Sequence, residues 1–373
     1  MRKMNHILFR PKKLLILSVL MLGTLATAQD HTDKRSVRRS FPATIGTTLE
    51  IQNKYGKIQI ATWDKDSVAI EVDILLTESS SSKLKKLKQG IKINFTGTRD
   101  YILAKTLIES ERGRLASELK SIGNAISGSN KRIEINYTVH LPVHMDVVLN
   151  NKFGDIYMDD LDGQVDITLS NGVLKANKLM GNATLSLSFA NGMIKSLGSA
   201  NLKLSYSDLV LDEASQLDLV SKSSKLNVDS VNVLKMDSRR DKLYFKHVEF
   251  FYGSSNFTTV WVYDFLRESD LYMKYGELTI EHVMPGFSKI YVESDYTDVS
   301  LYFDRAATLE FDIFHHEKTT LRLPGTEVLA EETPSGKDHY TTVGTMGTMG
   351  TGSPRGKLNI DALQKCYINI TYK

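Results

Sequence analysis

The sequence predicts an all-β fold, a solenoid built from short strands. Three observations favour this fold class: apolar and polar residues alternate over short segments, turn residues recur at nearly constant spacing, and one turn motif appears three times. A fixed-period repeat of short strands is typical of a stack in which each unit buries too little apolar surface to fold alone. Stacked neighbours would share one core and pair their backbone groups.

The repeated motif places glycine directly after an aromatic residue. Its copies are residues 53–58 (Asn-Lys-Tyr-Gly-Lys-Ile), 151–156 (Asn-Lys-Phe-Gly-Asp-Ile) and 274–278 (Lys-Tyr-Gly-Glu-Leu). Between the last two copies, turn residues follow one another every 16 to 20 positions, at Gly154, Gly172, Gly192, Asp208, Lys225 and Lys242. Asn-Gly and Ser-Asp pairs at several of these turns tolerate a positive φ angle, which supports the assignment of turns.

Alternation between the turns predicts which side chains face the core. In two successive units the residues expected to point inward are Leu185, Leu187, Phe189, Leu202, Leu204 and Tyr206. A propeller would need a repeat of about 40–50 residues, which exceeds the spacing found here. The 98-residue separation of the first two motif copies leaves an immunoglobulin-like arrangement open for the N-terminal part.

Residues 1–28 have the three parts of a secretory signal peptide. Five basic residues precede an apolar run at 14–25, and Ala-Thr-Ala at 26–28 forms the cleavage site. The run is shorter than the roughly 18 residues that a membrane span requires, and no cysteine follows it for a lipid anchor. We therefore expect an extracytoplasmic protein, in the periplasm or at the cell surface, with no permanent membrane span.

Charge and cysteine content narrow the class of protein further. The net charge of +3 becomes −2 once the five basic residues of the signal are removed, so we expect no general attraction to nucleic acid. The single cysteine, Cys366, cannot form an internal disulfide and lies in an alternating segment, where a small apolar strand residue is expected. The mature chain is long enough to be stabilised by burial instead.

The segments of the mature chain differ in composition. We expect a polar, basic lead-in at 29–40, an N-terminal β region at 41–150 with an inserted excursion at 77–130, and solenoid repeats at 151–330. A Gly/Thr/Ser-rich loop at 331–356 and closing strands at 357–373 would follow. Within the excursion, residues 79–90 predict a short helix with a solvated lysine face, and residues 103–126 predict an irregular, partly helical segment.

No group of residues has the spacing of a catalytic or metal site, and no cofactor is expected. His315 and His316 are adjacent, so in a strand they would point to opposite faces. Residues 159–163 (Asp-Asp-Leu-Asp-Gly) lack calcium-loop spacing and are typical of a turn. Recurring aspartates leave open a carboxylate ladder of the kind a polysaccharide-active enzyme would need: Asp208, Asp212, Asp218, Asp229, Asp237 and Asp241. No Gly-x-Ser-x-Gly motif is present.

Aromatic residues are concentrated between residues 250 and 275. Alternation assigns about half of them to the core, and the rest could form an apolar platform for a sugar or a partner protein. The candidate ligand-binding residues are Phe251, Tyr252, Trp261 and Tyr263. The other interpretation is a bulky core layer or an end of the stack.

These features together resemble the bacterial putative-adhesin family of exported β-solenoid proteins of unknown function. The resemblance rests on the Asn-Lys-aromatic-Gly turns, on residues 135–142 that lead into the second turn, and on residues 161–165, and it covers about residues 41–310. It implies a right-handed β-helix-like stack outside the cytoplasm and offers no catalytic residues. The sequence departs from the family in the excursion at 77–130 and in the aromatic-rich repeats after Lys225.

The sequence therefore predicts an exported, non-catalytic binding or structural protein, an adhesin that presents a repetitive surface to a glycan or to an envelope or host protein. One alternative is a periplasmic scaffold or sensing protein of the cell envelope. The second alternative is a polysaccharide-active β-helix enzyme.

Overall fold

The computed structural model describes residues 30–108, 132–347 and 356–373. The predicted signal peptide lies outside the described residues, and so do most of the segment 103–126 and the residues 348–355 of the predicted Gly/Thr/Ser-rich loop.

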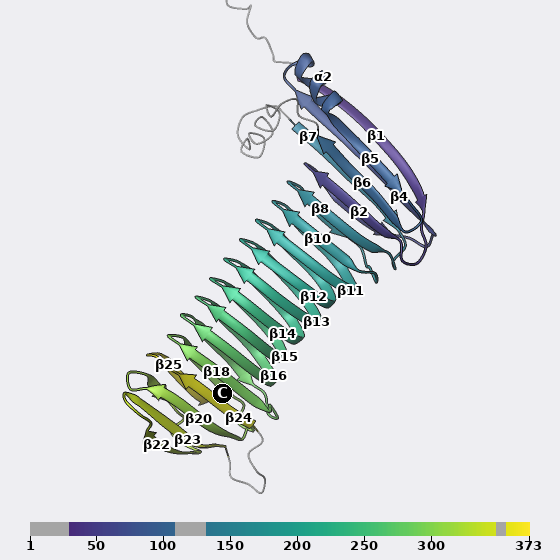
Figure 1. Cartoon of the computed structure of the whole chain (residues 1–373). Coiled ribbons are helices and arrows are strands. Elements are labelled where there is room, and N and C mark those ends of the chain that lie inside the picture. The colour runs from purple at the N-terminus through teal and green to yellow at the C-terminus, as the bar shows by residue number, and fades with distance from the viewer. Residues whose placement is uncertain (1–29, 109–131, 348–355) are drawn as a thin grey trace, which may run out of the picture.

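The chain folds as a β-solenoid whose strands stack side by side along one axis, which confirms the predicted fold class (Figure 1). One turn of the solenoid is called a rung below. Successive rungs pair in parallel and in register, so that Asn191 pairs with Asp208, Asp208 with Lys225, and Lys225 with Lys242. Each of these steps is 17 residues. The six long strands of the middle rungs are β11 (Val173–Ser188), β12 (Asn191–Ser205), β13 (Asp208–Lys222), β14 (Lys225–Arg239), β15 (Lys242–Asn256) and β16 (Thr259–Lys274).

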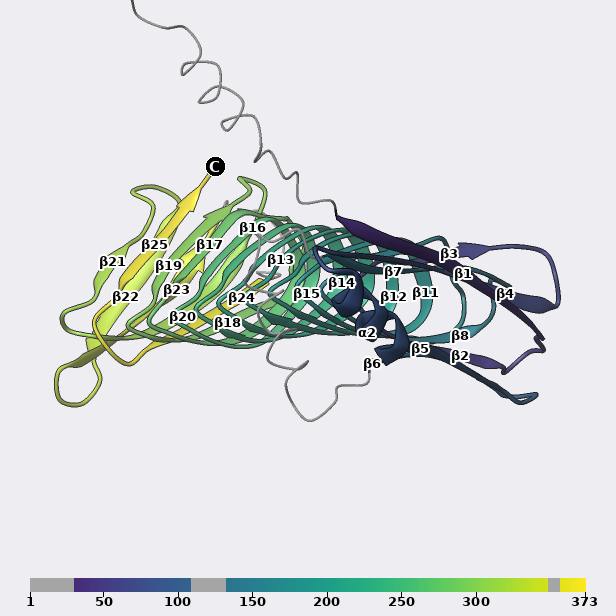
Figure 2. The same cartoon turned by 90° about the horizontal axis from the view of Figure 1, so that it is seen from above.

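These strands are longer than the short strands that the sequence predicts. Each contains a bend near its middle, and pairing with the neighbouring rungs continues on both sides of the bend, so one strand supplies two halves of a rung (Figure 2). Gly198 lies at the bend of β12, where a Cβ atom would be 2.4 Å from the carbonyl oxygen of Met180 on the previous rung. The bends of β11 and β15 also shift the pairing register by one residue.

Rungs nearer the ends are made of pairs of shorter strands. On the N-terminal side these strands are β2 (Thr48–Lys54), β3 (Ile58–Thr62), β8 (Asp146–Lys152), β9 (Ile156–Met158) and β10 (Val165–Ser170). On the C-terminal side they are β17 (Glu277–Val283), β18 (Lys289–Asp295), β19 (Asp298–Phe303), β20 (Leu309–His316), β21 (Thr320–Arg322), β24 (Gly356–Ala362) and β25 (Tyr367–Tyr372).

Antiparallel strands cap the N-terminal end of the stack. β4 (Ser67–Glu78) lies between β1 (His31–Pro42) and β7 (Arg132–Leu141), and β5 (Ile91–Gly97) pairs with β6 (Tyr101–Ile108). The predicted lead-in at 29–40 is therefore wrong from residue 31 on, because these residues pair along the whole length of β4. The charged side chains of β1 make it a suitable edge strand, since charge discourages pairing with another chain.

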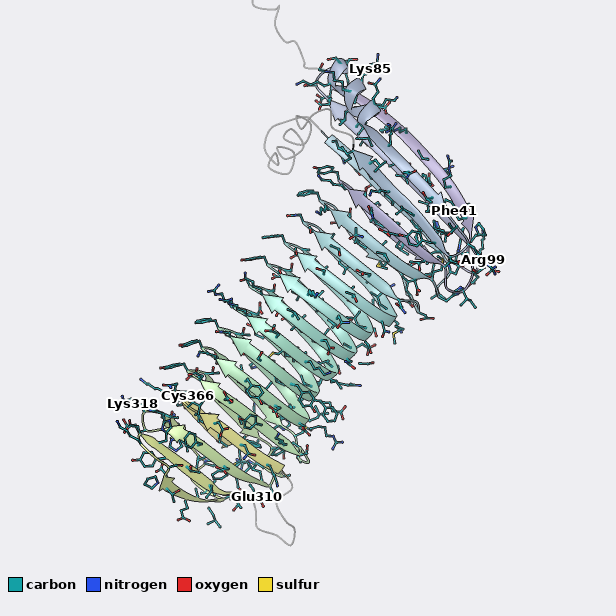
Figure 3. The ribbon with its side chains drawn as sticks, in the orientation of Figure 1. Phe41, Lys85, Arg99, Glu310, Lys318 and Cys366 are labelled. Carbon is teal, nitrogen blue, oxygen red and sulfur yellow. The ribbon has the colours of Figure 1, made fainter. Side chains whose placement is uncertain are left out.

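The predicted helix in the excursion is present as α2 (Ser81–Gly90), with Lys85 at its exposed surface (Figure 3). The segment from residue 103 was expected to be irregular, but residues 103–108 belong to β6, which pairs with β2 in parallel. Within the described part of the chain, no helix combines the length and apolar character that crossing a membrane requires.

The C-terminal strands enter the stack between strands that precede them in sequence. β24 lies between β18 and β20, and β25 lies between β19 and β21. A hairpin of β22 (Val328–Pro334) and β23 (His339–Met346) covers the outer edge of β20. The prediction of a loop over 331–356 is thus wrong for residues 331–334 and 339–346, because the first belong to β22, which pairs with β23, and the second form β23, which also pairs with β20.

A single apolar core runs through the stack. The expected inward positions of Leu185 and Leu202 are confirmed, and in-register pairing places Leu219 next to them in the same column. Phe189 and Tyr206 are the exception, because they are 61% and 50% exposed. Both take a positive φ angle at the point where one rung passes to the next, and this turn directs their side chains outward.

This turn, called the corner below, occurs once per rung. The corner residues with positive φ are Tyr55, Phe153, Asn171, Phe189, Tyr206, Ser223, Arg240, Phe257, Tyr275 and Tyr296. A small or inward-facing polar residue follows each of them. In the repeated motif this residue is glycine because the rungs approach closely there: a Cβ atom on Gly154 would lie 2.0 Å from the carbonyl oxygen of Gly56.

In the middle rungs the residues after the corner form a buried polar column, Ser207, Ser224, Asp241 and Thr258. Asp241 is its centre. The carboxylate accepts hydrogen bonds from the hydroxyls of Ser221 and Ser238, both at 2.6 Å, and from the backbone N–H groups of Ser224 at 2.7 Å and Arg239 at 2.9 Å. Four donors therefore compensate the burial of this side chain.

We expect the substitution Asp241→Ala to lower the free energy of unfolding by about 3 kcal/mol, because it removes the acceptor of three buried donors and of the part-buried N–H of Arg239. Urea unfolding followed by circular dichroism measures the change. The matched control is Asp237→Ala, which removes an exposed carboxylate four residues earlier, in β14. It should change the free energy of unfolding by less than about 0.5 kcal/mol. Equal effects of the two substitutions would contradict the role assigned to Asp241.

Candidate ligand-binding groove

An open groove of about 340 Å³ lies on the outer surface of β14, β15 and β16. It is formed by the first halves of these strands, just after the corner. Its lining residues are Asn227, Val228, Asp229, Tyr244, Phe245, Lys246, Trp261 and Tyr263. Aromatic rings and a few polar groups are thus gathered on one surface, which is the usual composition of a site for a small ligand.

In-register stacking brings the groove residues together. Tyr244 pairs with Asn227 on one side and with Trp261 on the other, and all three side chains point outward from the core. Tyr263 follows Trp261 by two positions and therefore shares its face of the strand. The ring centroids of Trp261 and Tyr263 are 5.8 Å apart, with 44° between the ring planes.

Glu281 and Lys373 form a charged pair beside Trp261, at the edge of the groove. The indole N–H of Trp261 donates to Oε1 of Glu281 at 3.3 Å, and Lys373 Nζ donates to Oε2 of the same carboxylate at 2.7 Å. Lys373 Nζ also lies 6.0 Å from the ring centroid of Tyr263. The hydrogen bond from Lys373, with a further one from Trp261, lowers the pKa of Glu281 below its ordinary value, against a smaller opposing effect of burial.

The structure separates the four residues that the sequence analysis proposed as ligand-binding. Trp261 and Tyr263 lie in the groove. Phe251 is fully buried in the core and cannot contact a ligand at the surface. Tyr252 belongs to the second half of β15, where Glu268, Asp270 and Lys289 surround it, so it is on another surface of the rung.

Tyr244 is a groove residue that the sequence analysis missed. A signal for it is present, because Tyr244 precedes Trp261 by 17 residues and therefore occupies the same position one rung earlier.

The aspartates do not form the continuous carboxylate ladder that the sequence left open. Asp208 pairs with Lys225, and Asp218 pairs with Lys235, whereas Asp212 and Asp229 occupy equivalent positions, each one residue after the paired Leu211 and Val228. Asp241 is buried under its four hydrogen-bond donors. Among the residues that the structure describes, no group of three or more His, Cys, Asp and Glu side chains could hold a metal ion.

His315 and His316 diverge, as the sequence analysis expected of adjacent strand residues. His315 is buried with Nε2 3.1 Å from the hydroxyl of Thr342, whereas His316 accepts a hydrogen bond from the backbone N–H of Lys318. Cys366 is buried at the C-terminal end of the stack, immediately before β25 rather than inside a strand (Figure 3). Burial raises the pKa of its thiol. A raised pKa disfavours the nucleophilic thiolate form.

No protein-family model matches the chain, and no curated protein matches it. Among solved structures, the chain is similar to a "putative cell adhesion protein" from Clostridium sporogenes, with 10% identity, coverage of 91% of this chain and 100% of the other, and a TM-score of 0.19. Two proteins from Parabacteroides distasonis are also similar. One is a "putative lipid binding protein" (12% identity, 72% and 93% coverage, TM-score 0.25), and the other is a "putative adhesin" (11% identity, 73% and 94% coverage, TM-score 0.28).

The hydrogen bond between Trp261 and Glu281 predicts a pH-dependent signal. The folded-state pKa of Glu281 is lowered, so its stabilising contribution is present above the ordinary glutamate pKa and is lost as the pH falls through the lowered value. In a Trp63→Phe protein, where Trp261 is the remaining tryptophan, we expect its fluorescence to change with a midpoint below the ordinary glutamate pKa.

The hydrogen bond from Lys373 is the largest cause of the lowered pKa of Glu281. The substitution Lys373→Ala should therefore move the midpoint of the fluorescence change to higher pH. The control Glu281→Gln should abolish the transition. A transition that persists in Glu281→Gln would assign the signal to another group.

Proposed function

We propose that this protein is an exported, non-catalytic binding protein of the adhesin type that holds an uncharged glycan in the groove on β14–β16. The observation that carries the proposal is the cluster of Tyr244, Trp261 and Tyr263 rings beside hydrogen-bonding side chains on an open surface. Aromatic rings provide large apolar surfaces for the C–H groups of a sugar, and polar side chains orient its hydroxyls.

The charges of the groove favour an uncharged ligand. Among the residues that line the groove, Asp229 is the one carboxylate and Lys246 is the one basic side chain. Their opposite charges offset each other. Asn227 adds both donors and acceptors without charge. A carbohydrate, whose hydroxyls both donate and accept, fits this set of partners.

The same residues favour binding over cleavage. A glycosidase of the common type requires two carboxyl groups that flank the scissile bond. Asp229 is the single carboxylate that lines the groove, and the nearby Glu281 is engaged by Lys373 and Trp261. The rigid stack of paired strands holds the groove residues in fixed positions, which suits a preorganised binding surface.

The substitution Trp261→Ala tests the groove. We expect it to weaken binding to the preferred member of an array of neutral oligosaccharides by at least about tenfold, because an aromatic anchor supplies much of the energy of such a site. The melting temperature should remain nearly unchanged, since Trp261 lies outside the core. The control is Trp63→Ala, which removes the other tryptophan, at the N-terminal end of the stack, and should leave binding intact.

Two results of this experiment would reject the groove. One is unchanged affinity of the Trp261→Ala protein, and the other is failure of the wild-type protein to bind any neutral oligosaccharide on the array.

The export signal at residues 1–28 and the adhesin role are tested by protease treatment of intact cells. An epitope inserted between residues 348 and 355 should be digested in intact cells if the protein is displayed at the surface. Protection until lysis would instead favour the periplasmic scaffold or sensing role. A cytosolic protein of known abundance serves as the control for cell integrity.

A further inference from the structure

The corner carries a row of exposed aromatic rings outside the groove. Phe189, Tyr206, Phe257, Tyr275 and Tyr296 are between 40% and 61% exposed, and each has a positive φ angle. Residues other than glycine and asparagine rarely adopt a positive φ angle, because this backbone conformation crowds the Cβ atom against the backbone. Strained residues with large exposed apolar side chains are a recurrent mark of functional surfaces.

The turn itself does not require an aromatic residue. Asn171 and Ser223 occupy the same corner position on other rungs, with φ angles of 57° and 51°. Asparagine tolerates this conformation best among non-glycine residues, so it would form the corner with less strain. The aromatic identity therefore needs a reason beyond the backbone.

The rings present their edges to solvent. Phe257 and Tyr275 stack with centroids 4.9 Å apart and 10° between planes, and Tyr275 and Tyr296 stack at 5.1 Å and 5°. Phe189 and Tyr206 form a second stack at 5.1 Å and 3°. Within each stack the faces cover one another, and the outward edges carry the positive part of the aromatic quadrupole.

Basic residues occupy the rungs between the two stacks. They are all exposed or half-exposed and form no ion pair among the described residues: Lys222, Lys225, Arg239, Arg240 and Lys242. The guanidinium carbon of Arg240 lies 5.9 Å from the ring centroid of Phe257, so the basic group continues directly into the aromatic stack. Asp208, which pairs with Lys225, and Asp237, which lines the same hollow as Arg239, are acidic residues next to this group. Further along the corner, Lys274 pairs with Asp295 at 2.6 Å, and the exposed Glu277 and Asp298 follow Tyr275 and Tyr296 by two residues.

We infer that the corner from Tyr206 to Tyr296 binds an extended acidic polysaccharide that lies parallel to the solenoid axis, with its carboxylates on the basic rungs between Tyr206 and Phe257. Five rung steps at about 4.8 Å give a straight row of about 24 Å, which suits a linear polymer. Cationic side chains and electropositive ring edges both favour carboxylate groups, and the ring edges also offer apolar contact to the sugar rings. This surface adjoins the groove, because Lys225 Nζ lies 5.5 Å from the ring centroid of Tyr244, but the two proposals rest on different residues and share only the class of ligand.

The ring geometry favours a polysaccharide over a nucleic acid. Bases bind proteins by stacking on aromatic faces, and the faces within these stacks are already covered. An acidic peptide offers the same charges, but it is more flexible and loses more conformational entropy when it lies along a straight row.

The test measures binding of alginate, a polymer of uronic acids, to the full-length mature protein by biolayer interferometry. The aromatic variant Phe257→Asn/Tyr275→Asn keeps residues suited to positive φ, and the basic variant is Lys222→Gln/Arg239→Gln/Arg240→Asn. We expect each variant to bind alginate about tenfold more weakly, a change of about 1.4 kcal/mol. The control Lys203→Gln/Lys235→Gln removes two exposed lysines on the second halves of the rungs and should bind as the wild type does.

Competing probes separate the sources of attraction. Neutral dextran tests for sugar contacts without charge, polyglutamate for charge without sugar, and single-stranded DNA for base stacking. We expect alginate to bind most tightly and its binding to weaken as salt is added. Equal affinity for polyglutamate or DNA would overturn the assignment of a polysaccharide.

Stability measurements separate a structural role of the rings from a binding role. If the aromatic variant lowers the melting temperature and leaves alginate affinity unchanged, the stacks stabilise the corner and the inference is wrong. The Trp261→Ala protein has an intact corner and should bind alginate normally, so failure of the groove and failure of the corner are distinguishable.

Discussion

The parallel, in-register pairing of rungs is the constraint on which the rest of the structure depends. In the middle of the stack every rung shares backbone hydrogen bonds with the rung before and the rung after it, so each residue lies beside its equivalent about 17 positions away. Residues of similar chemistry at equivalent positions therefore form a column along the solenoid axis. The apolar core, the buried polar column at Asp241, the groove and the stacked corner rings are four such columns.

Much of this fold could be predicted from the sequence, because turn spacing and alternation are local properties. The positions of Leu185 and Leu202 follow from alternation alone. Phe189 and Tyr206 could not be placed in this way, since a single residue with positive φ changes the phase of alternation and turns an expected core ring outward. The strands at 31–42, 328–334 and 339–346 were also missed, because their polar composition lacks the alternation that marks a strand with one buried face.

The candidate site was predicted in part, for a related reason. Trp261 and Tyr263 are separated by two residues within one half of a strand, where alternation holds. Phe251 and Tyr252 follow the bend of β15, where the register shifts between Val248 and Phe250. Alternation counted from the first half of the strand therefore gives no information on which of these two rings faces the core. Only the known period of 17 residues would have added Tyr244 to the groove.

The insertion of β24 and β25 between earlier strands has a consequence for how the chain completes its fold. β20 and β21 have no partner on their inner side until the last residues of the chain arrive, so the C-terminal part of the stack cannot assemble vectorially behind the growing chain. Until then β18 and β19 end in an unpaired parallel edge, which is a template for another chain. Loss of the final segment would thus leave these edges open and make the chain prone to end-to-end polymerisation.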